Sequence, residues 1–137
     1  MRYVLDTNVV SAMMKGDPAV LERLRRLGPD EVGVPQPVLA EIAYGIARLP
    51  RSRRKLTLTD LYESIARELA RCAWTDDVSA QFGHVKASLE RRGERIEDFD
   101  VAIAAHALAH GATLVTANRA HMVRVAGLEL EDWAAPP

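Results

Sequence analysis

The sequence predicts an α/β fold: a single domain with a mostly parallel central sheet flanked by helices. Short apolar runs alternate along the chain with longer segments whose apolar residues recur at helical spacing, which is typical of layered α/β domains. Strands separated by helices pair in parallel, because parallel neighbours need a crossover connection. The 137 residues fit one domain and contain no repeat or Gly/Ser-rich linker, so we expect one unit over residues 1–137.

The first half of the chain is expected to supply two strands and four helices. The strands are the short apolar runs at residues 3–5 and 32–34. Helices are indicated where apolar residues fall on one stripe or where Pro and Gly mark the ends. They are expected at residues 9–14, 18–28, 37–50 and 58–69.

The second half is expected to supply three strands, two long helices and a short element. Strands are expected at residues 72–74, 113–116 and 128–130. One helix is expected at residues 78–92, capped by Asp76 or Asp77 and ended by Gly93. A second, rich in Ala, is headed by Asp98 or Asp100 and runs to residue 109, and a short element is expected at 118–122.

Charge and cysteine content narrow the class of protein. With 18 Lys and Arg against 19 Asp and Glu, the formal net charge is −1, so any binding of nucleic acid must come from a local patch. One such patch is the expected loop from Arg48 to Lys55, which is either an RNA-backbone contact or a solvated loop. The single cysteine, Cys72, excludes an internal disulfide, and no apolar run reaches membrane-spanning length, so a cytoplasmic protein is expected.

Polar side chains follow the expected strands where an open parallel sheet places its functional crevice. Asp6 comes directly after the first strand, where its carboxylate either caps the next helix or faces the crevice. Asn118 follows the strand at 113–116, where it either offers an oxygen ligand or shapes the turn.

Two further acids lie at the edges of apolar helical surface. Glu41 borders the buried stripe of its helix, although a lone helical glutamate is commonly solvated. Asp100 stands between Phe99 and an apolar helix, where it either favours the helix N-terminus through the dipole or needs a cation as partner.

Carboxylates from distant segments are typical ligands of Mg²⁺ or Mn²⁺. Such an ion lowers the pKa of a bound water and offsets charge on phosphate oxygens, so phosphodiester hydrolysis is a natural reaction for this set. Zinc is disfavoured, because the four histidines form no paired-ligand motif, and His106 and His110 on one helix face are interpreted as packing and surface. The aromatic residues are too sparse for a platform of stacked bases.

Five segments in series resemble a VapC-type PIN-domain toxin. They are Asp6-Thr7-Asn8-Val9-Val10-Ser11, Leu39-Ala40-Glu41-Ile42-Ala43-Tyr44-Gly45, residues 96–105 with Asp100, Leu114-Val115-Thr116-Ala117-Asn118, and residues 125–133. Each is weak alone, but together they cover nearly the whole chain in order. The resemblance implies a single PIN-like domain and a metal-dependent endoribonuclease, the toxin of a type II toxin–antitoxin pair. It also implies a homodimer, and a heterotetramer or larger assembly with a VapB-like antitoxin whose tail enters the acidic groove.

The resemblance also implies residue roles. Asp6, Glu41 and Asp100 match the three acids of the family and would bind Mg²⁺, with Mn²⁺ as the alternative ion. Asn118 stands where many PIN domains have a fourth acid, so it can orient water or a carboxylate but adds no charge. Thr7 matches the hydroxyl that braces the first acid.

Two alternative functions remain at this stage. One keeps the PIN-like site but makes DNA, or structured RNA in processing without an antitoxin, the substrate. The other is a non-catalytic α/β signalling or binding module with Asp6 in a receiver-like acidic pocket. The module ranks low, because such a pocket needs paired acids after the first strand and this chain has Thr7 and Asn8 there.

Overall fold

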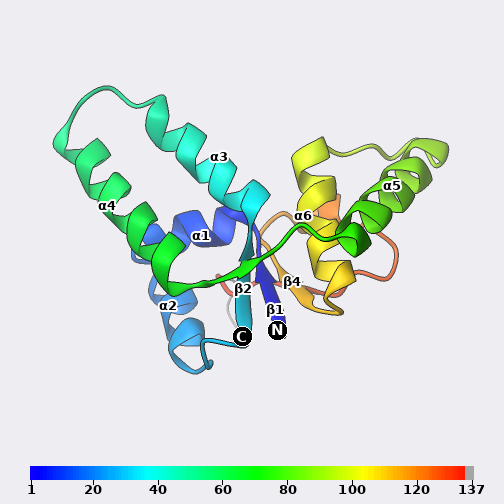
Figure 1. Ribbon diagram of the computed structural model, residues 1–137, viewed down its shortest axis with the longest axis horizontal. Coiled ribbons are helices and arrows are strands. Elements are labelled where there is room, and N and C mark those ends of the chain that lie inside the picture. The colour runs from blue at the N-terminus through cyan, green and yellow to red at the C-terminus, as the bar shows by residue number, and fades with distance from the viewer. Residues whose placement is uncertain (135–137) are drawn as a thin grey trace.

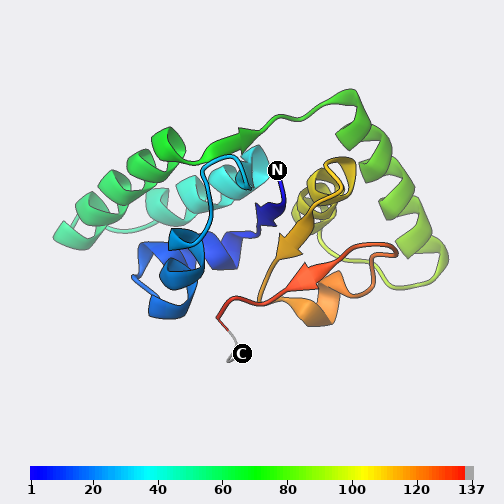
Figure 2. The same ribbon diagram turned by 90° about the horizontal axis from the view of Figure 1, so that it is seen from below.

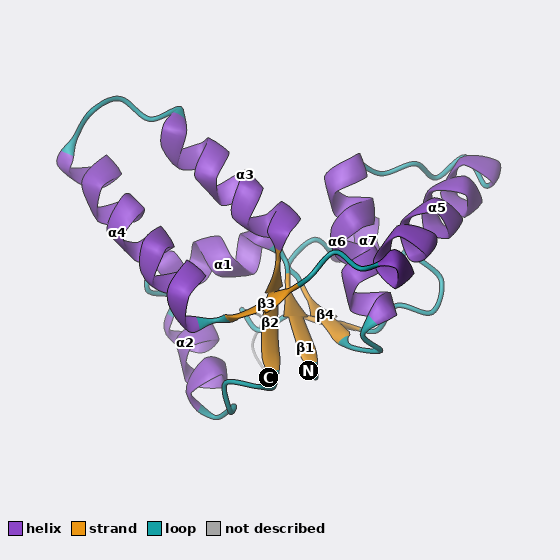
Figure 3. Ribbon diagram, viewed as in Figure 1, coloured by secondary structure: helices purple, strands orange, loops and turns teal. Residues whose placement is uncertain are grey.

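A parallel sheet of five strands forms the centre of the structure, a computed structural model that describes residues 1–134 (Figure 3). The strands are β1 (Tyr3–Leu5), β2 (Val32–Pro35), β3 (Ala70–Cys72), β4 (Thr113–Val115) and β5 (Leu130–Glu131). Their order is β3-β2-β1-β4-β5, and every described pair is parallel, as predicted. The chain adds β2 and β3 on one side of β1 and then crosses to the other side. A topological switch point therefore lies between β1 and β4.

Two groups of helices enclose this sheet. The first group is α1 (Thr7–Met14), α2 (Pro18–Arg25), α3 (Gln36–Ala47) and α4 (Arg53–Glu68). The second is α5 (Asp76–Arg91) and α6 (Asp98–Ala109), with the short α7 (Arg119–Met122) after β4. Figures 1 and 2 show the groups on opposite sides of β1, with α3 and α4 forming a hairpin whose loop points away from the sheet. The single PIN-like domain was expected to run to residue 137, and its last three residues lie outside the described part.

The core lies between the sheet and α6. Val4 and Leu5 of β1 and Leu114 of β4 are fully buried, as is Ile103 of α6. Residues 101–107 are all buried, so α6 has no solvent-facing stripe over this stretch. A helix that is apolar all round is buried all round, and the Ala-rich composition lets it approach its neighbours closely. This packing fixes the N-terminal end of α6, where Asp98 and Asp100 lie.

Two element boundaries differ from the prediction because hydrogen bonds decide them. The helix expected at 58–69 begins at Arg53, since the Ser52 hydroxyl accepts a hydrogen bond from the Lys55 amide at 3.1 Å. Three cations of the expected basic loop are therefore helical. The cap of α5 is Thr75, whose hydroxyl oxygen accepts from the Val78 amide at 3.3 Å, and not Asp76 or Asp77.

Strand pairing shifts two other elements. The strand expected at 72–74 lies at 70–72, where Cys72 stands opposite Pro35 of β2. The last strand lies at 130–131 instead of 128–130, where Glu131 pairs with Val115. Both shifts follow from register with a neighbouring strand, which local sequence does not encode.

Candidate active site

Asp6 lies at the carboxyl end of the central strand and is 2% exposed. It is also the N-cap of α1, since its Oδ1 accepts a hydrogen bond from the Thr7 amide at 2.7 Å. Its Oδ2 accepts from the Thr116 hydroxyl at 2.7 Å and from the Asn8 side-chain amide at 3.2 Å. The two expected roles of Asp6, cap and crevice acid, are therefore compatible. Three donors stabilise the charged carboxylate in a buried position.

Glu41 lies in the second turn of α3, and Thr7 holds it in place. The Thr7 hydroxyl donates to Glu41 Oε1 at 2.6 Å, which links the start of α1 to α3. The expectation that this hydroxyl braces Asp6 is wrong, because only the Thr7 amide reaches Asp6. Thr7 thus connects two of the acids, the first through its backbone and the second through its side chain.

Asp100 lies in the first turn of α6, and its carboxyl is electrostatically coupled to both other acids. Burial and, after it, the negative charges of Asp6 and Glu41 together raise the pKa of Asp100 to about 6, while His121 opposes them. The structure therefore brings the three predicted acids together at the switch point of the sheet.

Asn118 connects to this cluster through Thr116. Its backbone amide donates to the Thr116 hydroxyl oxygen at 2.9 Å, and that hydroxyl donates to Asp6. Its side-chain nitrogen lies 3.3 Å from Nδ1 of His121. Asn118 is thus placed beside the acids without contacting them directly in the described arrangement.

Asp98 and the histidine pair on α6 have other environments. Asp98 forms an ion pair with Lys86 at 3.0 Å and is well exposed. His106 is buried, and its Nδ1 lies 2.7 Å from the Ala102 carbonyl oxygen, whereas His110 is exposed. The interpretation of His106 and His110 as packing and surface is confirmed.

Sequence reasoning assigned no role in bracing Asp6 to Thr116 or Asn8. Thr116 follows the last residue of β4, which is the neighbour of β1, and it is fully buried. The Asn8 side-chain oxygen also accepts from the Ala117 amide at 2.9 Å and so ties α1 to the end of β4. The position of Thr116 at the end of a strand could have predicted its contact with Asp6, but only if the pairing of β1 with β4 had been known.

The three acids fit a hard divalent cation that keeps most of its own waters. They offer only carboxylate oxygens as ligands. No Lys or Arg is among the groups that shift the pKa of Asp100, so neither residue type offsets the repulsion between the acids. Within residues 1–134, no group of three or more His, Cys, Asp or Glu side chains is close enough to hold a metal ion as it stands, so bound waters would have to complete the ligand set. Mg²⁺ is commonly bound by one or two carboxylates and several waters, so an open set of this kind suits it.

The charge of Asp100 destabilises the metal-free protein at neutral pH. The folded state binds the Asp100 proton more tightly than the unfolded chain does. The loss of folding free energy that comes from ionising Asp100 is therefore absent well below pH 3.8, grows as the pH rises, and is complete above about pH 6. We expect Asp100→Asn to raise the stability by roughly 1 kcal/mol at pH 7.5 in EDTA, after discounting for solvent screening, and to have no effect near pH 3.5. Thermal melts at both pH values test this, and equal shifts at both would contradict the electrostatic origin.

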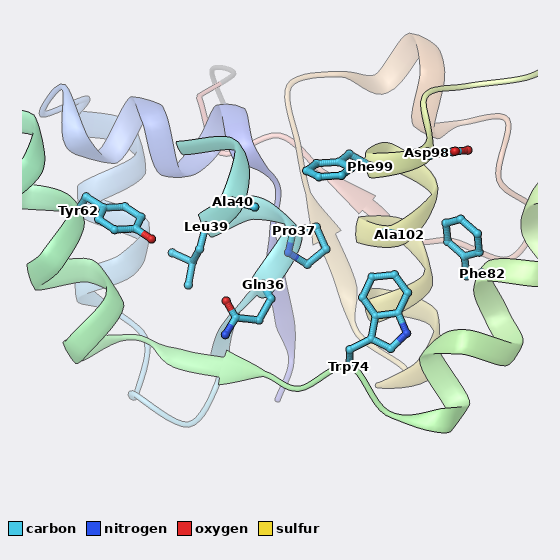
Figure 4. Close-up of a pocket in the computed structure, with 10 residues that line it drawn as sticks. All are labelled: Gln36, Pro37, Leu39, Ala40, Tyr62, Trp74, Phe82, Asp98, Phe99 and Ala102. Carbon is cyan, nitrogen blue, oxygen red and sulfur yellow. The ribbon is translucent and has the colours of Figure 1, made fainter. Parts of the chain in front are cut away.

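An apolar cavity of about 500 Å³ lies beside the acids. Its walls include Pro37 and Ala40 of α3, Trp74, and Phe99 of α6, which Figure 4 shows facing one another across the cavity. Ala40 precedes Glu41 and Phe99 precedes Asp100, so this cavity adjoins the acid cluster but contains none of it. Its apolar lining gives it no chemistry of its own.

The chain matches the model of a known domain family. The family model described as PIN domain matches residues 3–128, which is most of the chain. The chain belongs to the PIN-domain family. Its curated relatives in that family include Ribonuclease VapC2 of Rickettsia felis, 32% identical with 97% of this chain and 98% of the relative covered. A second, the tRNA(fMet)-specific endonuclease VapC of Shigella flexneri, is 28% identical with 98% and 99% covered.

Solved PIN-domain structures have the same architecture. VapBC2 from Rickettsia felis, bound to a DNA fragment of its promoter, matches with a TM-score of 0.86 and 29% identity over 97% of this chain and 99% of that one. DNA-bound VapBC from Salmonella typhimurium matches with a TM-score of 0.87 and 26% identity over 97% and 98%. This PIN domain is thus a VapC-type ribonuclease, and PIN-domain ribonucleases depend on divalent metal ions.

Proposed function

We propose that this VapC-type enzyme hydrolyses RNA phosphodiester bonds at the cluster of Asp6, Glu41 and Asp100, with Asn118 assisting and with Mg²⁺ as its ion. The observation that carries the proposal is the convergence of three carboxylates from distant segments on the switch point, where burial and the charges of Asp6 and Glu41 raise the pKa of Asp100 to about 6. When bound, the cation would offset charge on the phosphate and lower the pKa of a water. Mn²⁺ is the alternative ion.

Each residue then has a distinct task. Asp6 would hold the cation together with Asp100, and its orientation is fixed in advance by three hydrogen bonds. Glu41 has Oε1 occupied by Thr7, so Oε2 is the atom that would bind the ion or hold the attacking water. Asn118 has an amide that would orient a water or the phosphate, and it leaves the site with three negative charges instead of four.

Cleavage of total cellular RNA by the purified chain tests this function. We expect discrete fragments with Mg²⁺ or Mn²⁺ and none with EDTA, because without the cation nothing lowers the pKa of the attacking water or offsets the charge on the phosphate. Millimolar Mg²⁺ should also raise the melting temperature, since it binds the folded state only. Cleavage that persists in EDTA would contradict the proposed site.

Labelled single-stranded DNA and labelled structured RNA serve as parallel substrates. Preferred cleavage of either one would favour the alternative of a PIN-like nuclease acting on DNA or in RNA processing. Absence of cleavage by the folded, antitoxin-free chain on all three substrates would favour the non-catalytic module.

The assembly proposed for this chain rests on its relatives. Both solved relatives described above are VapBC complexes, which supports a VapB-like antitoxin as partner and a homodimer that forms a heterotetramer or larger particle with it. Within residues 1–134, no helix combines the length and apolar content needed to cross a membrane. A cytoplasmic location is proposed, since that is where cellular RNA is available.

A further inference from the structure

The outer face of α3 joins the acid cluster to the loop end of the α3–α4 hairpin (Figure 1). Its exposed side chains Ala40, Tyr44 and Arg48 follow one another at four-residue spacing, which places them in one row along the helix. Glu41 adjoins the start of this row, and Tyr44 lies three residues beyond it. At 1.5 Å per residue, the row climbs about 10 Å from Glu41 to Arg48.

Tyr44 is an exposed aromatic side chain on α3, three residues after Glu41. It is 66% exposed, the most exposed of the aromatic rings in residues 1–134. The guanidinium carbon of Arg48 lies 5.9 Å from its ring centroid, a cation–π distance that orders both groups. One face of the ring is thus backed by a cation, and most of the rest is open to solvent.

The cations beyond Tyr44 have no acidic partners within the described residues. Arg48, Arg51, Arg53 and Arg54 take part in none of the ion pairs found in residues 1–134, whereas Arg25, Arg26 and Arg92 elsewhere do. Lys55 donates to the carbonyl oxygens of Ala47 and Leu49 and so ties the start of α4 to the end of α3. The unpaired arginines around this junction, two of them in the first turn of α4, form a concentrated positive patch on a chain whose net charge is −1.

We propose that this face of α3 holds the single-stranded RNA substrate, with an unpaired base stacked on Tyr44 and the backbone phosphates bound by Arg48 and the arginines of the hairpin. The inference rests on the proposed ribonuclease function and assigns Tyr44 and Arg48 as the residues that position the substrate. Stacking on an aromatic side chain requires an unpaired base. The arginine guanidinium binds phosphate with two parallel hydrogen bonds. The strand would run from the acids, along α3, to the hairpin end.

Binding of a fluorescein-labelled single-stranded oligoribonucleotide to the full chain in EDTA tests this inference without cleavage. We expect Tyr44→Ala to weaken binding about tenfold and Tyr44→Phe to restore it, because stacking needs the ring and not the hydroxyl. Arg48→Ala should weaken binding and lower the slope of log affinity against log salt by about 0.7. A blunt-ended duplex RNA made of two fully paired strands should bind the wild-type and Tyr44→Ala chains alike.

Two controls lie on the same helical hairpin. Leu56, 68% exposed on α4, and Arg67, near the other end of α4, should tolerate replacement by Ala without loss of binding. The inference is overturned if the wild-type chain does not bind the single strand, if Tyr44→Ala binds as wild type, or if Tyr44→Ala changes only the oligomeric state or antitoxin binding. Metal-dependent cleavage is measured separately, so the ribonuclease proposal can hold when this inference fails.

Discussion

Asp6→Asn is expected to lower metal-dependent RNA cleavage by on the order of a hundredfold to a thousandfold. Asn has the size of Asp and keeps an oxygen for the Thr7 amide, and the Thr116 hydroxyl can rotate to accept instead of donate. The substitution therefore removes one negative charge from the proposed cation site while leaving the cap of α1. Initial cleavage rates on the RNA fragmented by the wild-type chain measure the effect.

Asp98→Asn is the matched control for this experiment. Asp98 lies two residues before Asp100 but forms an ion pair with Lys86 at the surface. We expect its variant to cleave as the wild type does, whereas Asp100→Asn should lose activity to the same degree as Asp6→Asn. Retained cleavage by both Asp6→Asn and Asp100→Asn, with folding verified by circular dichroism, would mean that the acid cluster is not the site.

Trp133→Ala is expected to destabilise the fold by about 3 to 5 kcal/mol, with a fall in melting temperature of roughly 10 °C or more. Trp133 is 2% exposed, and its ring meets Tyr3 edge to face at a centroid distance of 5.2 Å. Its indole N–H donates to Glu131 at 3.1 Å, and Glu131 also pairs with Arg23 of α2. The side chain thus ties the end of the chain to β1 and to α2.

Thermal melts of Trp133→Ala and Trp133→Phe separate packing from hydrogen bonding. The Phe variant should recover part of the loss, because it keeps a ring against Tyr3 but lacks the N–H donor. The match to the family model ends at residue 128, so this anchor lies beyond it. An unchanged melting temperature for the Ala variant would show that residues after 128 do not contribute to the core.

Local signals in the sequence predicted two of the three acids. Asp6 directly follows an apolar run, and Asp100 directly precedes a buried helix, so position alone places both at the edge of a parallel sheet. Glu41 depended on the resemblance to a family, since a glutamate at the border of a helical stripe is commonly solvated. The structure puts all three within electrostatic reach, as that resemblance implied.

The supporting contacts could not be predicted because they depend on strand order. Thr116 reaches Asp6 only because β4 pairs with β1, and the sequence near residue 116 does not indicate which strand β4 will pair with. The Thr7 hydroxyl donates to Glu41 because α3 packs on α1, and the residues next to Thr7 in the sequence do not encode that packing. The small number of aromatic residues argued against a platform for stacked bases. The exposure of Tyr44 close to Glu41 depends on the tertiary structure, so composition could not predict it.

The pairing of β1 with β4 has a consequence for the timing of synthesis. Asp6 leaves the ribosome early, but its hydroxyl partner Thr116 is made 110 residues later. A nascent chain that ends before β4 has an open edge on its central strand and lacks the bond that orients Asp6. The hydrogen bond that orients Asp6 therefore forms only when nearly the whole polypeptide has emerged, so the complete acid cluster is a late product of synthesis.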